Sequence, residues 1–204
     1  MSILSSSVSI TRYQVQGKIN APIIDNIANG LKSNTISDID NQVSDKAVGW
    51  TSFDKPFQPN FDGSTFVFGA YFVFALRIDK KSIAAKVLKK HYTIEAAKRL
   101  AESGREYLSK NEKKMIKEHV LNGLSLRIPA TPNVYDLVWN YESSTVWIFS
   151  NLKAANEELE NLFSKSFNLS LIRLFPYTAA ELASDLSDSQ LDELQKISPT
   201  LFVK

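Results

Sequence analysis

The sequence predicts an α+β fold, in which antiparallel β-hairpins and sheets pack with a long basic helical hairpin and short C-terminal helices. Two stretches, residues 65–78 and 134–150, carry alternating apolar residues on either side of turn residues, which is typical of β-hairpins. Between them, residues 80–124 have helical periodicity and a high density of lysine. Hairpins mixed with helices favour mainly antiparallel sheets.

The bulk composition is that of an ordinary globular protein. With 204 residues and 44% hydrophobic content, the chain is long enough for one large domain or two small ones. We expect an α+β domain over residues 1–177 and a short acidic helical tail over residues 178–204. The absence of cysteine excludes disulfides, thiolate metal sites and cysteine nucleophiles, and it fits a reducing cytosol.

The sequence contains no signal for export or membrane insertion. No apolar run reaches the ~18–20 residues that span a bilayer. The N-terminal residues lack the basic region and the long apolar region of a signal peptide. We therefore expect a cytoplasmic protein with no membrane partner.

The N-terminal part predicts a strand followed by a helix. Residues 7–16 alternate between apolar and polar side chains, and Gly17 closes the strand. Pro22 then occupies a position that the first turn of a helix tolerates, and apolar residues follow at helical spacing. Gly30 and Asn34 are expected to end this helix.

A long loop and a β-hairpin are expected next. Residues 34–60 are polar and contain two prolines, so we expect mostly loop, with Gly49 and Trp50 as a buried anchor. The hairpin comprises residues 65–68 and 71–78, joined by a Gly-Ala turn. Both faces of its second strand are largely apolar, which predicts a central strand covered on both sides.

The first helix of the basic region is expected over residues 82–103, because Gly104 is a suitable stop signal. At ~100° per residue, its apolar arc contains Ile83, Val87, Ile94 and Ala101. A neighbouring arc carries Lys86, Lys89 and Lys90.

The second helix of the basic region has a clear start. Ser109 and Glu112 fit a capping box, in which each side chain accepts a hydrogen bond from the backbone N–H of the other residue. Four lysines at i, i+3, i+4 and i+7 form one stripe, namely Lys110, Lys113, Lys114 and Lys117. Ammonium groups on one face repel one another, so either solvent screens them or a polyanion compensates them.

The remainder of the chain predicts a second hairpin, a helix, a strand and two short helices. The hairpin strands are residues 134–140 and 145–150, and the following helix is residues 152–163. A strand over residues 169–175 ends before Pro176. Two more capping boxes, which start at Thr178 and Ser187, predict two short acidic helices in the tail.

The distribution of charge is the main functional signal. Residues 77–127 contain fourteen Lys or Arg and six Asp or Glu, a net charge of +8, whereas the whole chain is only +2. Such a segment indicates an anionic partner, and lysines that meet phosphates give salt-dependent, largely sequence-blind binding. On the residues alone, a solvated helix pair that aids solubility accounts for the charge slightly better than binding does.

Signals for catalysis are poor. The two histidines, His91 and His119, lie in separate predicted helices, and none of the common hydrolase, phosphate-binding or dinucleotide motifs is present. The acidic residues are dispersed, except for Glu157, Glu158 and Glu160, which are expected on a solvated helix face. We expect no catalytic residue, no metal, no cofactor and no enzyme activity.

The hairpins are rich in aromatic residues, which include Trp139, Trp147 and Phe149 in the second one. Aromatic side chains can stack on the bases of single-stranded nucleic acid. However, alternating Phe and Trp residues in strands are more often part of the core, because a strand face needs apolar partners.

A set of features resembles one known family in order and pattern. In the first half of the chain they are Gly49-Trp50 after a polar loop, the strand from Phe72 to Arg77, Lys81 in the following turn and the long basic helix. In the second half they are Glu112-Lys113 and Val120-Leu121 in the second helix, the aromatic hairpin around Trp139 and Trp147, and Ala154-Ala155. On these residues the chain resembles the recombination-associated RdgC family of bacteria, over residues 8–175.

The resemblance implies a non-catalytic, largely sequence-independent DNA-binding protein that is nucleoid-associated. It implies double-stranded DNA, with single-stranded DNA as a second ligand, a ring-shaped homodimer with a basic inner surface, and restraint of a RecA-type recombinase. The expected DNA-binding residues are Arg77, Lys81, Lys86, Lys89, Lys90, Lys110, Lys113, Lys114 and Lys117.

Two departures from the family pattern change these expectations. The turn after Arg77 has Ser82-Ile83-Ala84-Ala85 in place of the usual Leu-Pro. Family members also usually continue further, and that C-terminal part contributes to ring closure, so we expect a different assembly. The alternative function is a protein-interaction module whose basic hairpin docks an acidic partner or the acidic tail of another copy, and the third is a nuclease.

Overall fold

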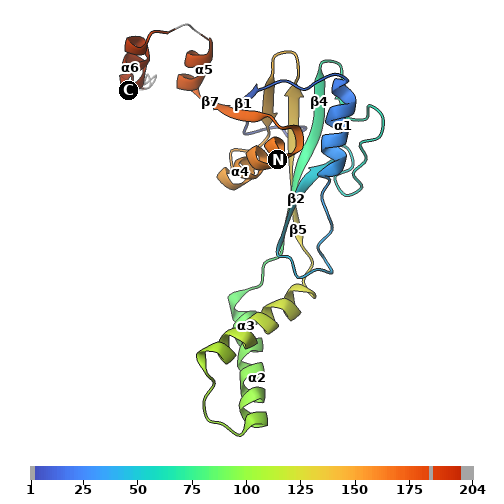
Figure 1. Cartoon of the computed structure of the whole chain (residues 1–204), viewed down its shortest axis with the longest axis vertical. Helices are drawn as coiled ribbons and strands as arrows, with labels where there is room; N and C mark the ends of the chain where they lie inside the picture. Colours follow the sequence, from blue (N-terminus) through green and yellow to red (C-terminus); the bar gives the residue numbers. More distant parts are fainter. Residues whose placement is uncertain (1–2, 184–185, 199–204) are drawn as a thin grey trace.

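A seven-stranded antiparallel sheet forms the body of the protein (Figure 1). The computed structural model describes residues 3–183 and 186–198, so tail residues 184–185 and 199–204, which fall in the predicted acidic tail, lie outside the description. The strand order is β2-β4-β5-β6-β1-β7, and β3 pairs with β4. The strands are β1 (Thr11–Gln16), β2 (Lys46–Thr51), β3 (Val67–Phe68), β4 (Tyr71–Lys80), β5 (Thr131–Asn140), β6 (Thr145–Ile148) and β7 (Ser170–Leu174).

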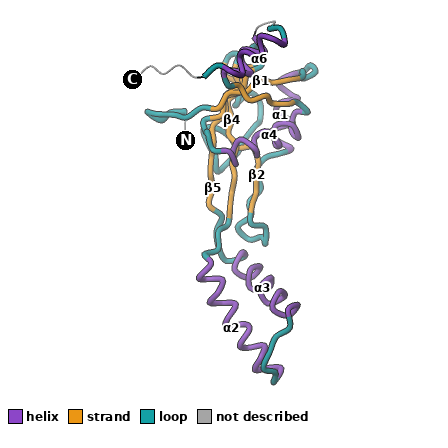
Figure 2. Tube along the Cα trace, turned by 90° about the vertical axis from the view of Figure 1, so that its left-hand side faces the viewer, coloured by secondary structure: helices purple, strands orange, loops and turns teal. Residues whose placement is uncertain are grey.

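Six helices accompany the sheet in the described part of the chain, which confirms the predicted α+β class. Helices α1 and α4 pack on the same side of the sheet (Figure 2). Helices α2 and α3 project from the end of the sheet at which β4 stops, and α5 and α6 lie near its opposite end (Figure 1). The helices are α1 (Ile23–Ser33), α2 (Ala85–Ser103), α3 (Lys110–Ser125), α4 (Lys153–Phe167), α5 (Pro176–Ala183) and α6 (Asp188–Lys196).

The main core lies between the sheet and the helices α1 and α4. It is dominated by aromatic side chains, because alternate residues of β4 and β5 point toward the helices. The ring centroids of Trp139 and Phe163 lie 4.9 Å apart, and those of Trp50 and Phe74 lie 5.1 Å apart. Gly30 was expected to end α1 but lies within it, where it leaves room for the ring of Phe167.

Strand β2 is the main element that the sequence interpretation missed. It lies inside the expected loop and pairs with β4, so that Trp50 lies opposite Leu76. Trp50 is buried, as predicted, and its indole N–H donates to the Ser166 hydroxyl over 2.7 Å. The strand is short and carries only Val48 and Trp50 on its core side, which is too weak an alternation to stand out in a polar segment.

The apolar side of α2 differs from the predicted one, although Ile83, just before the helix, does pack against the small core that α2 and α3 share. Val87 and Ile94 are exposed, and no residue of this helix is fully buried. The side that contacts α3 is formed instead by Leu88, Tyr92, Ala96 and Leu100. The helix thus carries two apolar arcs, the predicted one and the i, i+4 row that begins at Leu88. The row makes the contact with α3 because its side chains are larger and bury more apolar surface.

Three smaller differences concern strand and helix ends. Strand β1 begins only at Thr11, and its residues Tyr13 and Val15 enter the main core. Strand β4 is central as predicted, but Tyr71 at its start is exposed on the side away from α1 and α4. Helix α5 begins at Pro176, a residue whose fixed φ suits a first helical position, and not at the predicted Thr178. The Thr178 hydroxyl lies in the first turn and accepts a hydrogen bond from the N–H of Phe175, the residue before the helix.

Candidate nucleic-acid interface

The two projecting helices have a small core of their own. Leu108, Ile116, Val120 and Leu124 are buried there, and the contact row of α2 packs against them. This cluster is separate from the main core, so the α2–α3 pair is held together by its own apolar contacts. The lysines on the outer surfaces of both helices therefore lie on helices whose relative position is fixed by this core.

The start of α3 is fixed by the predicted capping box. The Ser109 hydroxyl accepts from the Glu112 N–H over 3.3 Å, and a Glu112 carboxylate oxygen accepts from the Ser109 N–H over 2.8 Å. The backbone hydrogen bond from Ser109, together with the Arg105 guanidinium, lowers the pKa of Glu112 to about 2. The first turn of α3 therefore has a defined orientation, and the lysines that follow have defined positions.

A groove of about 410 Å³ lies between the two helices, and lysines from both of them line it. Ala85, Leu88, Lys89 and Tyr92 come from α2, and Lys113, Lys114 and Lys117 come from α3. The four lysines are exposed, and none of the residues that line the groove is acidic. The groove thus has an apolar base and cationic edges, and it favours an anionic occupant.

Three more lysines of the predicted set lie on the same two helices outside the groove. Lys86, Lys90 and Lys110 are exposed but do not line it. Lys114 pairs with Glu118 at 3.8 Å, and both side chains are exposed, so this ion pair contributes little. The structure therefore brings together four of the nine predicted residues and places three more on the outer surfaces of the same helices.

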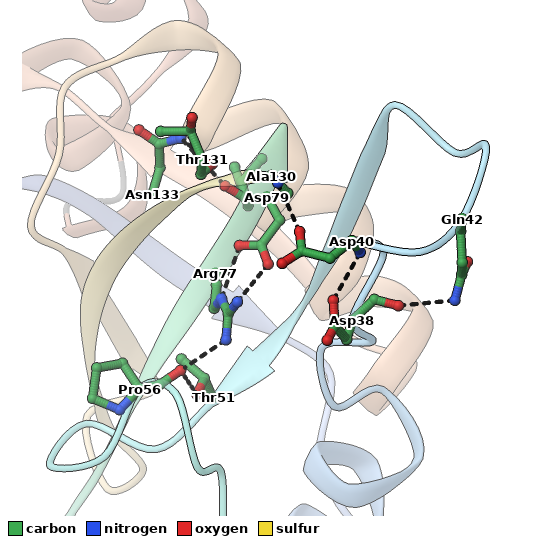
Figure 3. A network of polar contacts seen from close by, with 11 residues as sticks. Asp38, Asp40, Gln42, Thr51, Pro56, Arg77, Asp79, Ala130, Thr131 and Asn133 are labelled. Carbon is green, nitrogen blue, oxygen red and sulfur yellow. Dashed lines mark hydrogen bonds and ion pairs between the residues drawn. The ribbon is translucent and has the colours of Figure 1, made fainter. Parts of the chain in front are cut away.

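Arg77 lies near the end of β4, at the joint between the sheet and the projecting helices, and it does not line the groove. Figure 3 shows its polar partners. Its guanidinium donates to both carboxylate oxygens of Asp79, over 2.8 and 2.6 Å, and to the Pro56 carbonyl over 3.2 Å. It also lies 5.1 Å from the ring centroid of Phe57. Its charge is thus paired within the protein.

Lys81 is also placed at the joint, and it is buried. Its ammonium group donates to the carbonyls of Asp40, Gln42 and Ser125, over 2.9, 2.8 and 2.6 Å. The same loop is held from the other side, because the Asp40 carboxylate accepts from the Ala130 N–H over 2.7 Å (Figure 3). Lys81 thereby connects the C-terminal end of α3 to the loop before β2, a role that no sequence signal indicated.

A second cleft, of about 510 Å³, lies toward the loop between α2 and α3. Its lining mixes both signs of charge, with Glu95, Glu102 and Glu112 beside Arg99 and Arg105. His119 also lines it, but within residues 3–183 and 186–198 no group of three His, Asp or Glu side chains is arranged to hold a metal ion. The charges in this cleft largely balance, so it lacks the single sign of the lysine groove.

A comparison with family models places this chain beside known proteins. The family model described as "RdgC: Putative exonuclease, RdgC" matches residues 9–192, which is most of the chain. No curated protein matches the chain. None of the described helices is both long and apolar enough to cross a membrane.

Proposed function

The chain belongs to the RdgC family, and from this premise we propose that it binds duplex DNA with little sequence preference and without catalysing a reaction. The proposed contact surface is the groove between α2 and α3. Lys89, Lys113, Lys114 and Lys117 would contact phosphates there, and Lys86, Lys90 and Lys110 would extend the contact along the outer surfaces of the helices.

The single observation that carries this proposal is that lysines from two different helices line one groove that has no acidic residue. Each lysine that neutralises a phosphate releases condensed counterions, which makes the binding strong at low salt and weak at high salt. Lysine presents a compact point charge on a flexible stem, and contacts to phosphate carry no base information. Little sequence preference follows.

The family resemblance extends this proposal to recombination. A protein that covers duplex DNA through phosphate contacts would restrict access for a RecA-type recombinase, and a second copy of the chain would enlarge the contact. We propose both partners as consequences of DNA binding, so both depend on the groove. Degradation of a labelled duplex in the presence of Mg²⁺ or Mn²⁺ would contradict the non-catalytic part of the proposal.

The test is a fluorescence anisotropy titration of labelled duplexes of two unrelated sequences at low salt. The expected result is similar affinity for both, and a large loss of affinity when Lys113, Lys114 and Lys117 are all changed to Glu. Lys153→Glu is the matched control, because Lys153 is an equally exposed lysine on α4 in the body of the protein.

An acidic polypeptide distinguishes DNA binding from a general attraction to anions. Polyglutamate at the same charge concentration is expected to compete weakly, because its charges do not have the spacing of a duplex. Equal competition by polyglutamate would favour the acidic-partner alternative. No binding of either duplex at low salt, or affinity unchanged in the triple variant, would contradict the proposal.

A further inference from the structure

The face of the sheet opposite α1 and α4 is uncovered over part of its area (Figure 2). A shallow hollow of about 290 Å³ lies on it, at the end of β4 farthest from the projecting helices. Its lining comes from four strands, the residue that follows β6 and the N-terminal segment, and it comprises Ile3, Phe68, Tyr71, Val73, Val138, Trp147 and Phe149. None of these side chains is charged.

The hollow has a buried base and an aromatic rim. Val138 and Phe149 are buried. The three rim residues remain accessible, since Phe68, Tyr71 and Trp147 are 55%, 41% and 39% exposed. Aromatic side chains usually enter the core, so three of them around one hollow on a free sheet face form an apolar surface without a partner in the described part of the chain.

The N-terminal segment closes one side of the hollow and donates a hydrogen bond to a carboxylate of the sheet. The backbone N–H of Ile3 donates to the Asp136 carboxylate over 2.8 Å. Asp136 is buried and does not line the hollow. None of the residues that line the hollow is acidic, so no lining side chain repels an anionic ligand.

A cation lies next to the rim. Arg12 on β1 is directly opposite Trp147 on β6 in the antiparallel ladder, so the two side chains share the uncovered face. Arg12 is exposed, and none of the ion pairs formed by residues 3–183 and 186–198 involves it. An accessible guanidinium beside an accessible indole matches a ligand that has both a flat apolar ring and a negative charge.

We propose that this hollow binds unpaired bases of single-stranded nucleic acid, which stack on the aromatic rim while Arg12 contacts the phosphate backbone. Bases in a duplex have no free face, whereas unstacked bases commonly stack on aromatic side chains of an exposed sheet. The size favours this occupant over a second copy of the chain. A stable protein interface uses about 20–30 residues on each side, whereas seven residues line this hollow.

The three tryptophans make the test direct. Trp50 and Trp139 are 0% and 1% exposed, so quenching of intrinsic fluorescence by an added ligand reports on Trp147. We expect an oligothymidine to quench this fluorescence, and a duplex at the same nucleotide concentration to quench it far less. Trp147→Phe should abolish most of the signal change but retain binding measured by anisotropy, because phenylalanine still stacks.

Two further variants complete the test. Trp147→Ala is expected to weaken oligothymidine binding by about 5- to 150-fold, which is the usual effect of losing one base–aromatic stack. Tyr71→Ala should weaken oligothymidine binding in the same way. Agreement between the two variants would show that the loss does not come from a local distortion caused by the Trp147 substitution. The triple variant Lys113→Glu, Lys114→Glu, Lys117→Glu should still show quenching, so a failure of the duplex proposal leaves this one testable.

Two results would overturn the inference. One is an oligothymidine affinity that does not change in Trp147→Ala and Tyr71→Ala. The other is light scattering that shows a dimer of the unmodified chain which Trp147→Ala converts to a monomer, because the hollow would then be covered by a second copy.

Discussion

Lys89 of α2 and Lys117 of α3 lie on the edges of the same groove, although they belong to different helices. This relationship arises because the i, i+4 row that begins at Leu88 packs against α3 and thereby turns the adjacent Lys89 toward the lysines of the second helix. Two lysine sets that are separate in the sequence thus form one cationic surface. The proposed function rests on this surface.

Replacement of Lys81 by Met is expected to destabilise the joint between the sheet and the projecting helices. Three carbonyls would lose their common donor, and the one in the buried hydrogen bond, that of Ser125, would cost about 1–3 kcal/mol when left without a partner. Urea denaturation measures the free energy of unfolding, and hydrogen exchange at the C-terminal end of α3 should accelerate. Lys80→Met is the control, because Lys80 is exposed, and an equal loss in both variants would contradict this role for Lys81.

Gly49 is expected to tolerate no side chain. A Cβ atom at this position would lie 2.4 Å from the backbone N and Cα of Ile36, so the β2 backbone would have to move away from its neighbour. We expect Gly49→Ala to lower the free energy of unfolding by about 1–3 kcal/mol or more, as overpacking does. Thermal and urea unfolding of the purified variant measure it.

Gly123→Ala is the matched control for that substitution. Gly123 lies within α3, and a Cβ atom there would meet nothing within 4 Å. Alanine is a better helix former than glycine, so this variant should be more stable by about 0.5–1 kcal/mol. Destabilisation by both alanines to the same extent would show that the close approach of Ile36 is not the cause at Gly49.

The capping box of α3 should give a pH-dependent helix start. The pKa of Glu112 is lowered from 4.5 to about 2, so its stabilising effect is fully present above pH ~4.5 and is lost as the pH falls toward 2. A carboxyl-detected NMR titration should find this pKa, and Arg105→Ala should raise it. An ordinary pKa for Glu112 in the unmodified chain would contradict the capping geometry.

Ser109→Ala tests the same helix start from its other partner. Loss of an N-cap hydroxyl usually costs about 1 kcal/mol, and Ser109 is the residue whose hydroxyl accepts from Glu112. We expect this loss in urea denaturation at neutral pH. Ser187→Ala in α6 is a comparison within the same chain, because that helix has a capping box but no buried residue, so its loss should leave global stability nearly unchanged.

Much of the fold was predictable because its signals are local. The hairpins, the capping box at Ser109 and the helix α4 follow from patterns within a few residues, and the structure has them close to where they were expected. Strand β2 was not predictable in this way, because what defines it is pairing with β4 and the close approach of Gly49 to Ile36. The contact side of α2 depends likewise on α3, since α2 alone has little amphipathicity.

The candidate site shows the same division. The exposure of the lysines followed from charge, but their convergence on one groove required the packing of two helices. Lys81 looked like the other lysines in sequence, yet three carbonyls from two distant segments surround its ammonium group. The accessible rim around Trp147 was unexpected because a strand pattern does not tell which face of a sheet remains uncovered.

The most direct test of the central claim is the salt dependence of duplex binding by the unmodified chain, by Lys153→Gln and by a variant with Lys113, Lys114 and Lys117 changed to Gln. The logarithm of the association constant falls with the logarithm of salt concentration by about 0.9 per phosphate neutralised. The account predicts that the triple variant has a slope shallower by about 2–3, whereas Lys153→Gln leaves the slope unchanged. Equal slopes for all three proteins would contradict a phosphate-binding role for the groove.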